Sequence, residues 1–344
     1  MNATVKKILN CENPVLGPEC DTAVSSRVRL ARNLADFPFP GRLNQAGRKK
    51  VIETVNGAVN DTAGYEFIDF SALSPEEAGA LMEGRVVSLD FVKSPEEKEL
   101  IADEKNGLYV MVNEEDHLRI QSIKPGFAIY EAYDEANKFD DLADGRLDFA
   151  YDEDFGYLTQ CPTNLGTGLR VSVMLHLPAL TASRKIQAIA AELPKIGAAI
   201  RGFYGEGTEV GGDLYQISNN ITLGVSEQQT LEKIKVVAQR IIELERAGRN
   251  EILKNSNDQI KDKIKRACGI VKYAHMISSS EFLSLYSMIR LGINCGVVPD
   301  IEIGALDALL VKVMPANLSL EFSGEKKNRD ILRAEYIQSA IGKK

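Results

Sequence analysis

The sequence has no apolar run that approaches the ~18 uninterrupted residues of a membrane-spanning helix. Its N-terminus, MNATVKKILNCENPVLG, lacks the apolar core and the small residues that mark a secretory signal peptide. Cysteine is sparse: the five cysteines are odd in number and show no CxxC spacing, which suits a reducing compartment better than a disulfide or zinc scaffold. We therefore expect a soluble, cytoplasmic protein that does not associate with membranes.

An excess of positive charge is also missing. Lys and Arg number 41 against 49 Asp and Glu, and the formal net charge is −8. This balance argues against direct nucleic-acid binding, because phosphate contacts need a basic surface. It leaves room for one local arginine cluster that binds a small anion. At 344 residues, the chain is long enough for one large domain and a smaller one.

Two patterns divide the chain. Before Ser226, alternation of apolar and polar residues predicts strands at 86–92 and in the stretches GLYVMVNEED, HLRIQSI, GYLT and RVSVMLHL, with amphipathic helices at 127–141 and 183–193. Because strands and helices do not alternate regularly, we predict an α+β fold with an antiparallel sheet flanked by helices.

From Ser226 onward the periodicity predicts helices alone. Apolar stripes occur at 231–244, 260–271, 282–291, 306–313 and 329–341, and the polar stretch KNSNDQ after the first of them indicates a linker. We therefore predict two domains, a mixed one at 1–255 and a smaller, all-helical one at 256–344.

Paired arginines are the first candidate functional feature. In SSRVRLAR, residues 25–32, an extended strand would place Arg27 and Arg29 on one face while Val28 and Leu30 enter the core. Two neighbouring guanidinium groups favour an anion such as phosphate between them. A solvated strand face is the alternative that this stretch alone leaves open.

Acidic residues follow an apolar run in NEEDHLRI, residues 113–120. Polar groups at the end of a strand are typical of an active-site rim. These carboxylates could hold Mg²⁺, position a cationic substrate or cap a turn, and the residues alone leave all three interpretations open.

A turn follows Cys161 in CPTNLGTGLRVSVMLHL, residues 161–177. The Pro, Asn and Gly residues set the turn, and Arg170 enters the strand beyond it. A cysteine there can be a reactive thiolate if arginines lie near, although a lone cysteine is more often an inert core residue.

The stretch GFYGEGTEVGG, residues 202–212, has the glycine content of a phosphate-binding loop and follows Arg201. Its carboxylates, Glu206 and Glu209, would repel a phosphate. A loop of this composition suits a site where a cationic group is held beside a phosphate.

Together, SSRVRLAR, NEEDHLR, CPTNLGT with Arg170, and RGFYGEGTE resemble the catalytic motifs of the phosphagen (guanidino) kinases, over about residues 21–253. Two features are similar to one branch, the bacterial protein-arginine kinases of the McsB type. The first arginine motif comes too early for the family's N-terminal helical domain, and RDILRA near the C-terminus matches that branch's RDxxRA motif. The resemblance implies a phosphagen-kinase, glutamine-synthetase-like domain at 1–255 that uses ATP and Mg²⁺ to phosphorylate arginine residues of proteins.

The resemblance also implies roles for single residues. Glu115 and Glu206 would hold the acceptor guanidinium, and Cys161 would line that site. The ATP phosphates would be bound by five arginines: Arg27, Arg29, Arg119, Arg170 and Arg201. The implied ATP-binding residues are Ser25, Ser26, Arg27, Val28, Arg29, Arg119, Arg170, Val171, Ser172, Val173, Met174, Arg201, Gly202, Phe203, Tyr204, Gly205 and Glu206. Met174 replaces a histidine of the small-guanidine kinases, and Phe91 lies near a position where the family often has a histidine, so the resemblance defines the adenine contacts least.

The RDILRA motif is associated, in that branch, with a regulatory phosphoarginine pocket. The resemblance assigns this pocket to Arg329, Asp330, Arg333 and Ala334. Without the resemblance, Arg329 and Arg333, four residues apart on a helix, would equally fit a solvated surface.

The resemblance further implies partners: protein substrates with exposed arginines, a zinc-binding activator protein, a Clp-type ATPase and a heat-shock repressor. The marked proteins would be directed to Clp-type degradation. It implies a homodimer with a role in the stress response, its helical domain serving in dimerisation and docking. The alternatives are a kinase for free arginine or creatine and, in another class, an inactive adaptor that binds phosphoarginine.

Overall fold

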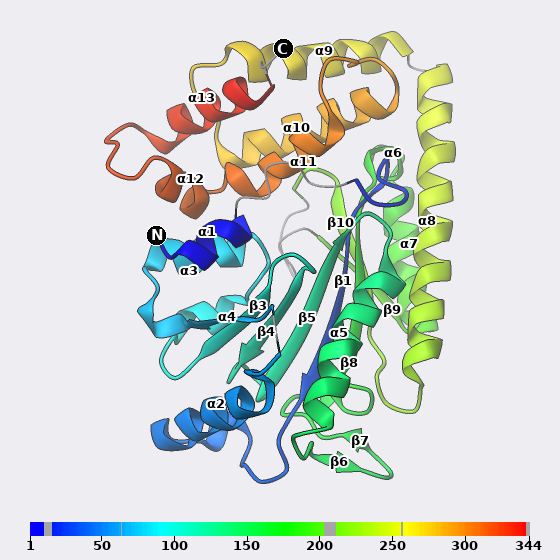
Figure 1. Ribbon diagram of the computed structural model, residues 1–344. Coiled ribbons are helices and arrows are strands. Elements are labelled where there is room, and N and C mark those ends of the chain that lie inside the picture. Colours follow the sequence, from blue (N-terminus) through cyan, green and yellow to red (C-terminus); the bar gives the residue numbers. More distant parts are fainter. Residues whose placement is uncertain (10–15, 63, 203–210, 256, 342–344) are drawn as a thin grey trace.

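An eight-stranded antiparallel sheet forms the centre of the molecule, and helices cover it and continue into a helical C-terminal region (Figure 1). The structure is a computed structural model that describes residues 1–9, 16–62, 64–202, 211–255 and 257–341. The predicted α+β fold, with an antiparallel sheet flanked by helices, is confirmed.

The strands lie in the order β2-β3-β4-β5-β1-β8-β10-β9, and each neighbouring pair is antiparallel. A separate two-stranded hairpin consists of β6 and β7. The bounds are β1 Ala23–Arg32, β2 Glu66–Asp69, β3 Glu99–Asp103, β4 Leu108–Val112, β5 Leu118–Pro125, β6 Tyr151–Asp152, β7 Gly156–Tyr157, β8 Leu169–His176, β9 Ala198–Gly202 and β10 Leu214–Asn219.

The main core lies between one face of the sheet and the helices α2, α5 and α8. A smaller cluster packs α1, α3 and α4 against the other face, at the β2–β4 edge. The helices of this part are α1 Ala3–Leu9, α2 Gln45–Val59, α3 Pro75–Glu83, α4 Leu89–Lys93, α5 Ile129–Asp144, α6 Pro178–Ala182, α7 Lys185–Glu192 and α8 Glu227–Asn255.

The C-terminal region has its own core, to which the sheet contributes Met174 and Leu214. Its helices are α9 Asn257–Tyr273, α10 Ser279–Asn294, α11 Ile303–Lys312, α12 Pro315–Glu321 and α13 Arg329–Ile341. All four helices predicted here are present. The linker predicted at KNSNDQ is wrong for most of its residues, because α8 ends at Asn255 and α9 begins at Asn257.

No single described helix is both long enough and apolar enough to cross a membrane. Among the described helices, only α11 and α12 taken together have the length and composition of a membrane span, and they are bent by 92° relative to each other.

The predicted strand at 86–92 is wrong, because its second half forms the helix α4. The Ser88 hydroxyl accepts a hydrogen bond from the Phe91 N–H at 3.1 Å and so caps the first turn. Phe91 is fully buried against Phe70, with 4.6 Å between ring centroids. Apolar residues at short spacing do not distinguish a strand from a short helix, and here the cap decides.

Candidate active site

All five predicted arginines lie on the same face of the sheet. Residues directly opposite each other in antiparallel strands share a face, as do residues two apart along a strand. Arg29 of β1 is opposite Arg170 of β8, and Ala31 is opposite Arg119 of β5. Arg27 precedes Arg29 by two residues on β1. The structure thus brings four arginines from three strands together.

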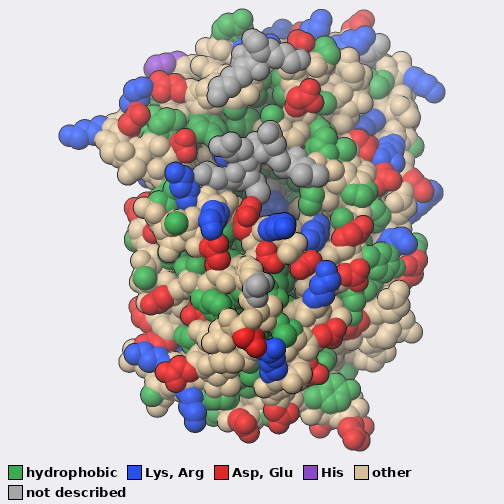
Figure 2. Space-filling model, viewed as in Figure 1, with side chains coloured by type: hydrophobic (Ala, Val, Ile, Leu, Met, Phe, Trp, Pro, Cys, Tyr) green, Lys and Arg blue, Asp and Glu red, His purple; other side chains and the backbone are tan. Residues whose placement is uncertain are grey.

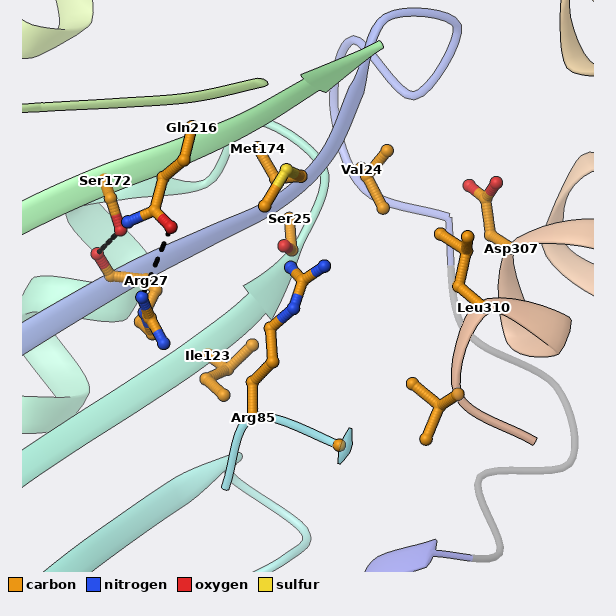
Figure 3. Close-up of a pocket in the computed structure, with 12 residues that line it drawn as sticks. Val24, Ser25, Arg27, Arg85, Ile123, Ser172, Met174, Gln216, Asp307 and Leu310 are labelled. Atoms are coloured by element: carbon orange, nitrogen blue, oxygen red, sulfur yellow. Dashed lines mark hydrogen bonds between the residues drawn. The ribbon is translucent and has the colours of Figure 1, made fainter. Parts of the chain in front are cut away.

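Arg201 joins this face through a row that crosses four strands. It is opposite Gln216 of β10, Gln216 is opposite Met174 of β8, and Met174 is opposite Ser25 of β1. Arg27 Nη2 donates a hydrogen bond to Gln216 Oε1 at 3.4 Å (Figure 3).

Four of the predicted ATP-binding residues have side chains on the opposite face. Val28, Val171 and Val173 are buried in the main core. The Ser26 hydroxyl donates to Gly126 O at 2.9 Å and accepts from Ala128 N at 3.0 Å, so it fixes the entry to α5. These side chains therefore shape the sheet and do not face the arginines.

The neighbouring arginines on this face of the sheet shift each other's pKa values. Burial and the nearby Arg85 and Arg170 guanidinium groups lower the pKa of Arg27 to about 9. Burial and the neighbouring arginines also lower the pKa of Arg29 well below its usual value. The Arg29 Nε–H is buried without a hydrogen-bond acceptor among the described residues. A group of cations with a buried free donor is suited to bind an anion.

Arg119 is held by the acidic turn that precedes its strand. It forms ion pairs with Glu114, at 2.9 Å, with Glu115, and with Asp116, at 3.4 Å. Although burial opposes it, these three carboxylates raise the pKa of Arg119. The NEEDHLR stretch thus makes a turn, with Asn113 at a φ of +61°, that fixes one arginine of the site.

Asp116 connects this turn to the cysteine motif. Its fully buried carboxylate accepts hydrogen bonds from the Gln160 N–H at 2.9 Å and from Asn33 Nδ2 at 2.8 Å. The turn that follows Cys161 is present as predicted, with Gly168 at a φ of +63° where an added Cβ would meet Ala31 O at 2.6 Å. Asp116 therefore positions Glu115 and Cys161 relative to each other.

A cavity of about 130 Å³ lies where these elements meet. Its lining includes Arg29, Arg119, Arg170, Glu115 and Cys161. The half-buried Cys161 thiol is 3.0 Å from Thr163 Oγ1. The structure thus brings together three predicted arginines, one predicted glutamate and the predicted cysteine.

Glu115 has a perturbed carboxyl group. Burial raises its pKa, Arg119 opposes the rise, and Asp116 and Glu114 add to it. A carboxylate with a raised pKa beside a cluster of arginines is a candidate proton acceptor.

A second cavity, of about 180 Å³, continues along the same face. Figure 3 shows Ser25, Ser172 and Met174 on the strands, with Arg85 and Leu310 reaching toward them from the other side. Sequence reasoning missed Arg85, Gln216 and the C-terminal residues of this cavity. No local motif marks them, because only the tertiary fold brings them to the sheet.

Part of the predicted site cannot be placed. Phe203, Tyr204, Gly205 and Glu206 lie outside the described residues, whereas Gly202 ends β9 beside Arg201.

The RDILRA motif forms the start of α13. Arg333 is 1% exposed and donates to Val313 O and Ile277 O, both at 2.9 Å, and to Asp330 Oδ1 at 2.5 Å. A fully solvated surface is thus wrong for Arg333, while Arg329 is exposed and Ala334 is buried. The assignment of this motif to phosphoarginine stays a prediction.

Among the described residues, no group of three or more His, Cys, Asp or Glu side chains could hold a metal ion. On the side of the molecule seen in Figure 2, basic and acidic side chains are interspersed and form no continuous basic band.

Known proteins match this chain over nearly its full length. The model of the ATP:guanido phosphotransferase C-terminal catalytic domain matches residues 47–248, and that of the protein-arginine kinase McsB C-terminal domain matches residues 257–344. The chain is 44% identical to the protein-arginine kinase of Caldanaerobacter subterraneus subsp. tengcongensis, over 94% of this chain and 98% of the relative. It is 41% identical to the protein-arginine kinase of Pelotomaculum thermopropionicum, over 94% and 93%.

Solved structures show the same fold. A duplicated taurocyamine kinase from Schistosoma mansoni, with bound transition-state-analogue components, is 28% identical with a TM-score of 0.62, over 70% of this chain and 35% of that one. A lombricine kinase is 23% identical with a TM-score of 0.60, over 70% of each chain, a likeness of fold alone.

Proposed function

The chain belongs to the ATP:guanido phosphotransferase family and carries the McsB C-terminal domain, and on this premise we propose that it is a protein-arginine kinase. It transfers the γ-phosphoryl group of ATP to the guanidinium of arginine residues in proteins. The observation that carries this proposal is the cavity in which Arg29, Arg119 and Arg170 meet Glu115 and Cys161. Such a cavity offers cations for phosphate and a carboxylate for the incoming guanidinium.

The arginines bind the nucleotide's phosphates and stabilise the charge of the transferring group. Phosphoryl transfer has a loose transition state whose charge spreads over the equatorial oxygens, so fixed cations provide most of the stabilisation. Arg29 and Arg170 are in place before the nucleotide arrives, because the pairing of β1 with β8 sets their separation.

The acceptor guanidinium is a poor nucleophile while it is protonated. Its pKa lies far above neutral pH, so its neutral form costs roughly 9 kcal/mol near pH 7. No glutamate removes that proton in advance. We propose that Glu115 orients the acceptor and receives its proton as the N–P bond forms and the bond from the γ-phosphorus to the bridging oxygen breaks, which releases ADP. Glu206, outside the described residues, is the proposed second carboxylate.

Mg²⁺ accompanies the nucleotide in this proposal and neutralises charge on the phosphate oxygens. The arginines that line the cavity, Arg29, Arg119 and Arg170, would hold the phosphates of the nucleotide that carries the ion.

For the cell, we propose a cytoplasmic, homodimeric enzyme whose C-terminal domain serves in dimerisation and docking and senses phosphoarginine. Its partners in a stress response would be the protein substrates, a zinc-binding activator, a Clp-type ATPase and a heat-shock repressor, and the marked proteins would be directed to Clp-type degradation. The curated relatives' name and the McsB C-terminal domain support the protein-arginine activity and leave these wider roles as proposals.

The proposed activity is tested by incubating the protein and MgATP with an arginine-rich protein or with free arginine. Mass spectrometry under non-acidic conditions then detects phosphoarginine, because the N–P bond is acid-labile. We expect phosphorylated arginine residues in the protein substrate. Phosphorylation of free arginine alone would instead identify a small-guanidine kinase, and binding of phosphoarginine without transfer would identify an inactive adaptor.

A further inference from the structure

The cavity of about 180 Å³ has two walls of different origin (Figure 3). One wall is the sheet, whose apolar residues here are Val24, Ile123 and Met174. The other comes from outside the sheet, with Leu310 and Val311 of α11 in the C-terminal region and Arg85 directly after α3. A space with apolar side chains on both sides suits a flat, weakly polar group such as a nucleobase.

This cavity continues into the row of arginines. Ser25, Arg27 and Arg29 point to one face at two-residue steps, and the first two line the cavity while the third lines the cavity of Glu115. Four residues of a strand span about 13 Å. A ligand that follows this row has its apolar end beside Met174 and its anionic end beside Arg29, which is the chemistry of a nucleoside triphosphate.

Hydrogen bonds between α3 and α12 hold the wall of the cavity that comes from outside the sheet. Both Glu83 carboxylate oxygens accept from the start of α12, one from Ala316 N at 2.8 Å and the other from Asn317 N at 3.0 Å. Arg85 follows two residues after Glu83, and its carbonyl accepts from the buried Gln121 Nε2 at 2.9 Å. The position of Arg85 is thereby tied to the C-terminal helices and to β5 together.

Asp307 of α11 adds a polar group to this wall. Its carboxylate accepts from Tyr286 Oη at 2.6 Å and from Arg290 Nε at 2.9 Å. Arg290 also donates to Cys20 O at 2.7 Å, just ahead of β1. A carboxylate has about four acceptor sites, so Asp307 can still accept a hydrogen bond from a ribose hydroxyl.

We propose that α11 of the C-terminal region, together with Arg85, forms one wall of the nucleoside site, so that the nucleotide is bound across the junction of the two parts of the chain. The inference rests on the proposed function in taking ATP as the ligand. Binding of the nucleoside then stabilises the attachment of the C-terminal helices to the sheet, and their attachment strengthens nucleotide binding by the same factor.

The test compares the affinities of ATP and inorganic tripolyphosphate for the full-length protein. Val311 is half-buried, so Val311→Trp fills the cavity without emptying the core. We expect it to weaken ATP binding by about tenfold or more, equivalent to roughly 1.4 kcal/mol, and to leave tripolyphosphate binding within about twofold. Lys312→Trp, one position along α11 and outside this cavity, should leave both affinities unchanged. Wild-type ATP affinity in Val311→Trp would overturn the proposal.

A measurement on the unaltered protein keeps the test decisive if the variant fails to fold. Hydrogen exchange in α11 should slow when ADP binds and remain unchanged with tripolyphosphate. Equal exchange rates in α11 with both ligands would contradict the proposal that α11 contacts the nucleoside. Neither assay needs phosphoryl transfer, so a protein that binds ATP across α11 but phosphorylates nothing would refute the proposed function alone.

Discussion

Arg29 of β1 lies directly opposite Arg170 of β8, and both side chains line the cavity that holds Glu115 and Cys161. The backbone ladder thus fixes two like charges side by side. Such an arrangement costs free energy in the empty protein and is useful when an anion lies between them.

Replacing one member of this pair should impair catalysis without harming the fold. We expect Arg29→Met to lower the transfer rate by about a hundredfold or more, because a fixed donor to the transition state is lost. The melting temperature without nucleotide should stay the same or rise, since repulsion is relieved. A steady-state ADP-release assay and a thermal melt measure the two effects. Arg240→Met, which removes an exposed arginine on α8, is the control, and an Arg29→Met rate within a few-fold of wild type would contradict the role.

Glu115 should control the acid side of the pH–rate profile. Its pKa is raised by burial and by Asp116 and Glu114, against the opposing effect of Arg119. Because transfer needs the ionised carboxylate, the rate should fall as the pH falls through this raised pKa. Glu115→Gln should lose transfer by about a hundredfold or more while retaining ATP binding. Glu104→Gln, at an exposed turn, should match wild type; a Glu115→Gln enzyme with full activity would remove Glu115 from the mechanism.

The cysteines should differ in reactivity. Burial raises the pKa of the Cys268 and Cys295 thiols, which lowers their thiolate fraction near neutral pH. Cys161 lines the cavity with three arginines. We expect iodoacetamide to modify Cys161 about tenfold faster than Cys268 or Cys295, as measured by peptide mass spectrometry. An arginine peptide with MgADP should protect it, and labelling of Cys268 ahead of Cys161 would contradict the assignment.

The two arginines of the RDILRA motif should have different roles: Arg333 should contribute to stability, and Arg329 to phosphoarginine binding. Arg333→Ala leaves the carbonyls of Val313 and Ile277 without a donor, so we expect a loss of about 1–3 kcal/mol in the free energy of unfolding. Arg329→Ala, at an exposed position, should leave stability unchanged. If the motif binds phosphoarginine, calorimetry should show weaker binding to Arg329→Ala. An Arg333→Ala protein of wild-type stability would show that these hydrogen bonds contribute little.

The sequence predicted the sheet class and the arginine face well for a physical reason. Alternation along SSRVRLAR places Val28 and Leu30 in the core, which leaves Arg27 and Arg29 on the other side whatever the rest of the fold. Helix periodicity likewise located α13 at its observed ends. These features depend on local spacing alone.

Long-range features were beyond the sequence. Strand pairing places Arg170 opposite Arg29 across 141 positions of chain, and the motif resemblance, not any local rule, grouped them. Arg85, Asp307 and Gln216 carry no motif and were missed, since their place depends on how α3, α11 and β10 pack. The strand predicted at 86–92 failed because a single Ser88 cap outweighs an ambiguous apolar pattern.

His117 makes the structure sensitive to acid. The Leu34 N–H donates to His117 Nδ1 at 3.0 Å, so this nitrogen carries no proton, and Nε2–H donates to Pro38 O at 3.0 Å. The buried ring is therefore neutral, and burial lowers its pKa to about 4 despite the Pro38 contact and Asp116. Protonation would replace an accepting nitrogen by a second donor that faces the Leu34 N–H.

The sign of the pH dependence follows from the two states. In the unfolded chain a histidine has a pKa of about 6.5, so unfolding takes up a proton below that pH while the folded ring stays neutral down to about 4. The stabilising contribution is complete above about pH 6.5 and declines as the pH falls, by at most roughly 1.4 kcal/mol per pH unit. Urea unfolding between pH 7.5 and 5 measures this slope. His117→Gln should be less stable at pH 7.5 but have a shallower slope, with the remainder due in part to His176, whose pKa burial also lowers. His275→Gln, at an exposed site, is the control. Equal slopes in wild type and His117→Gln would show that folding does not lower the pKa of His117.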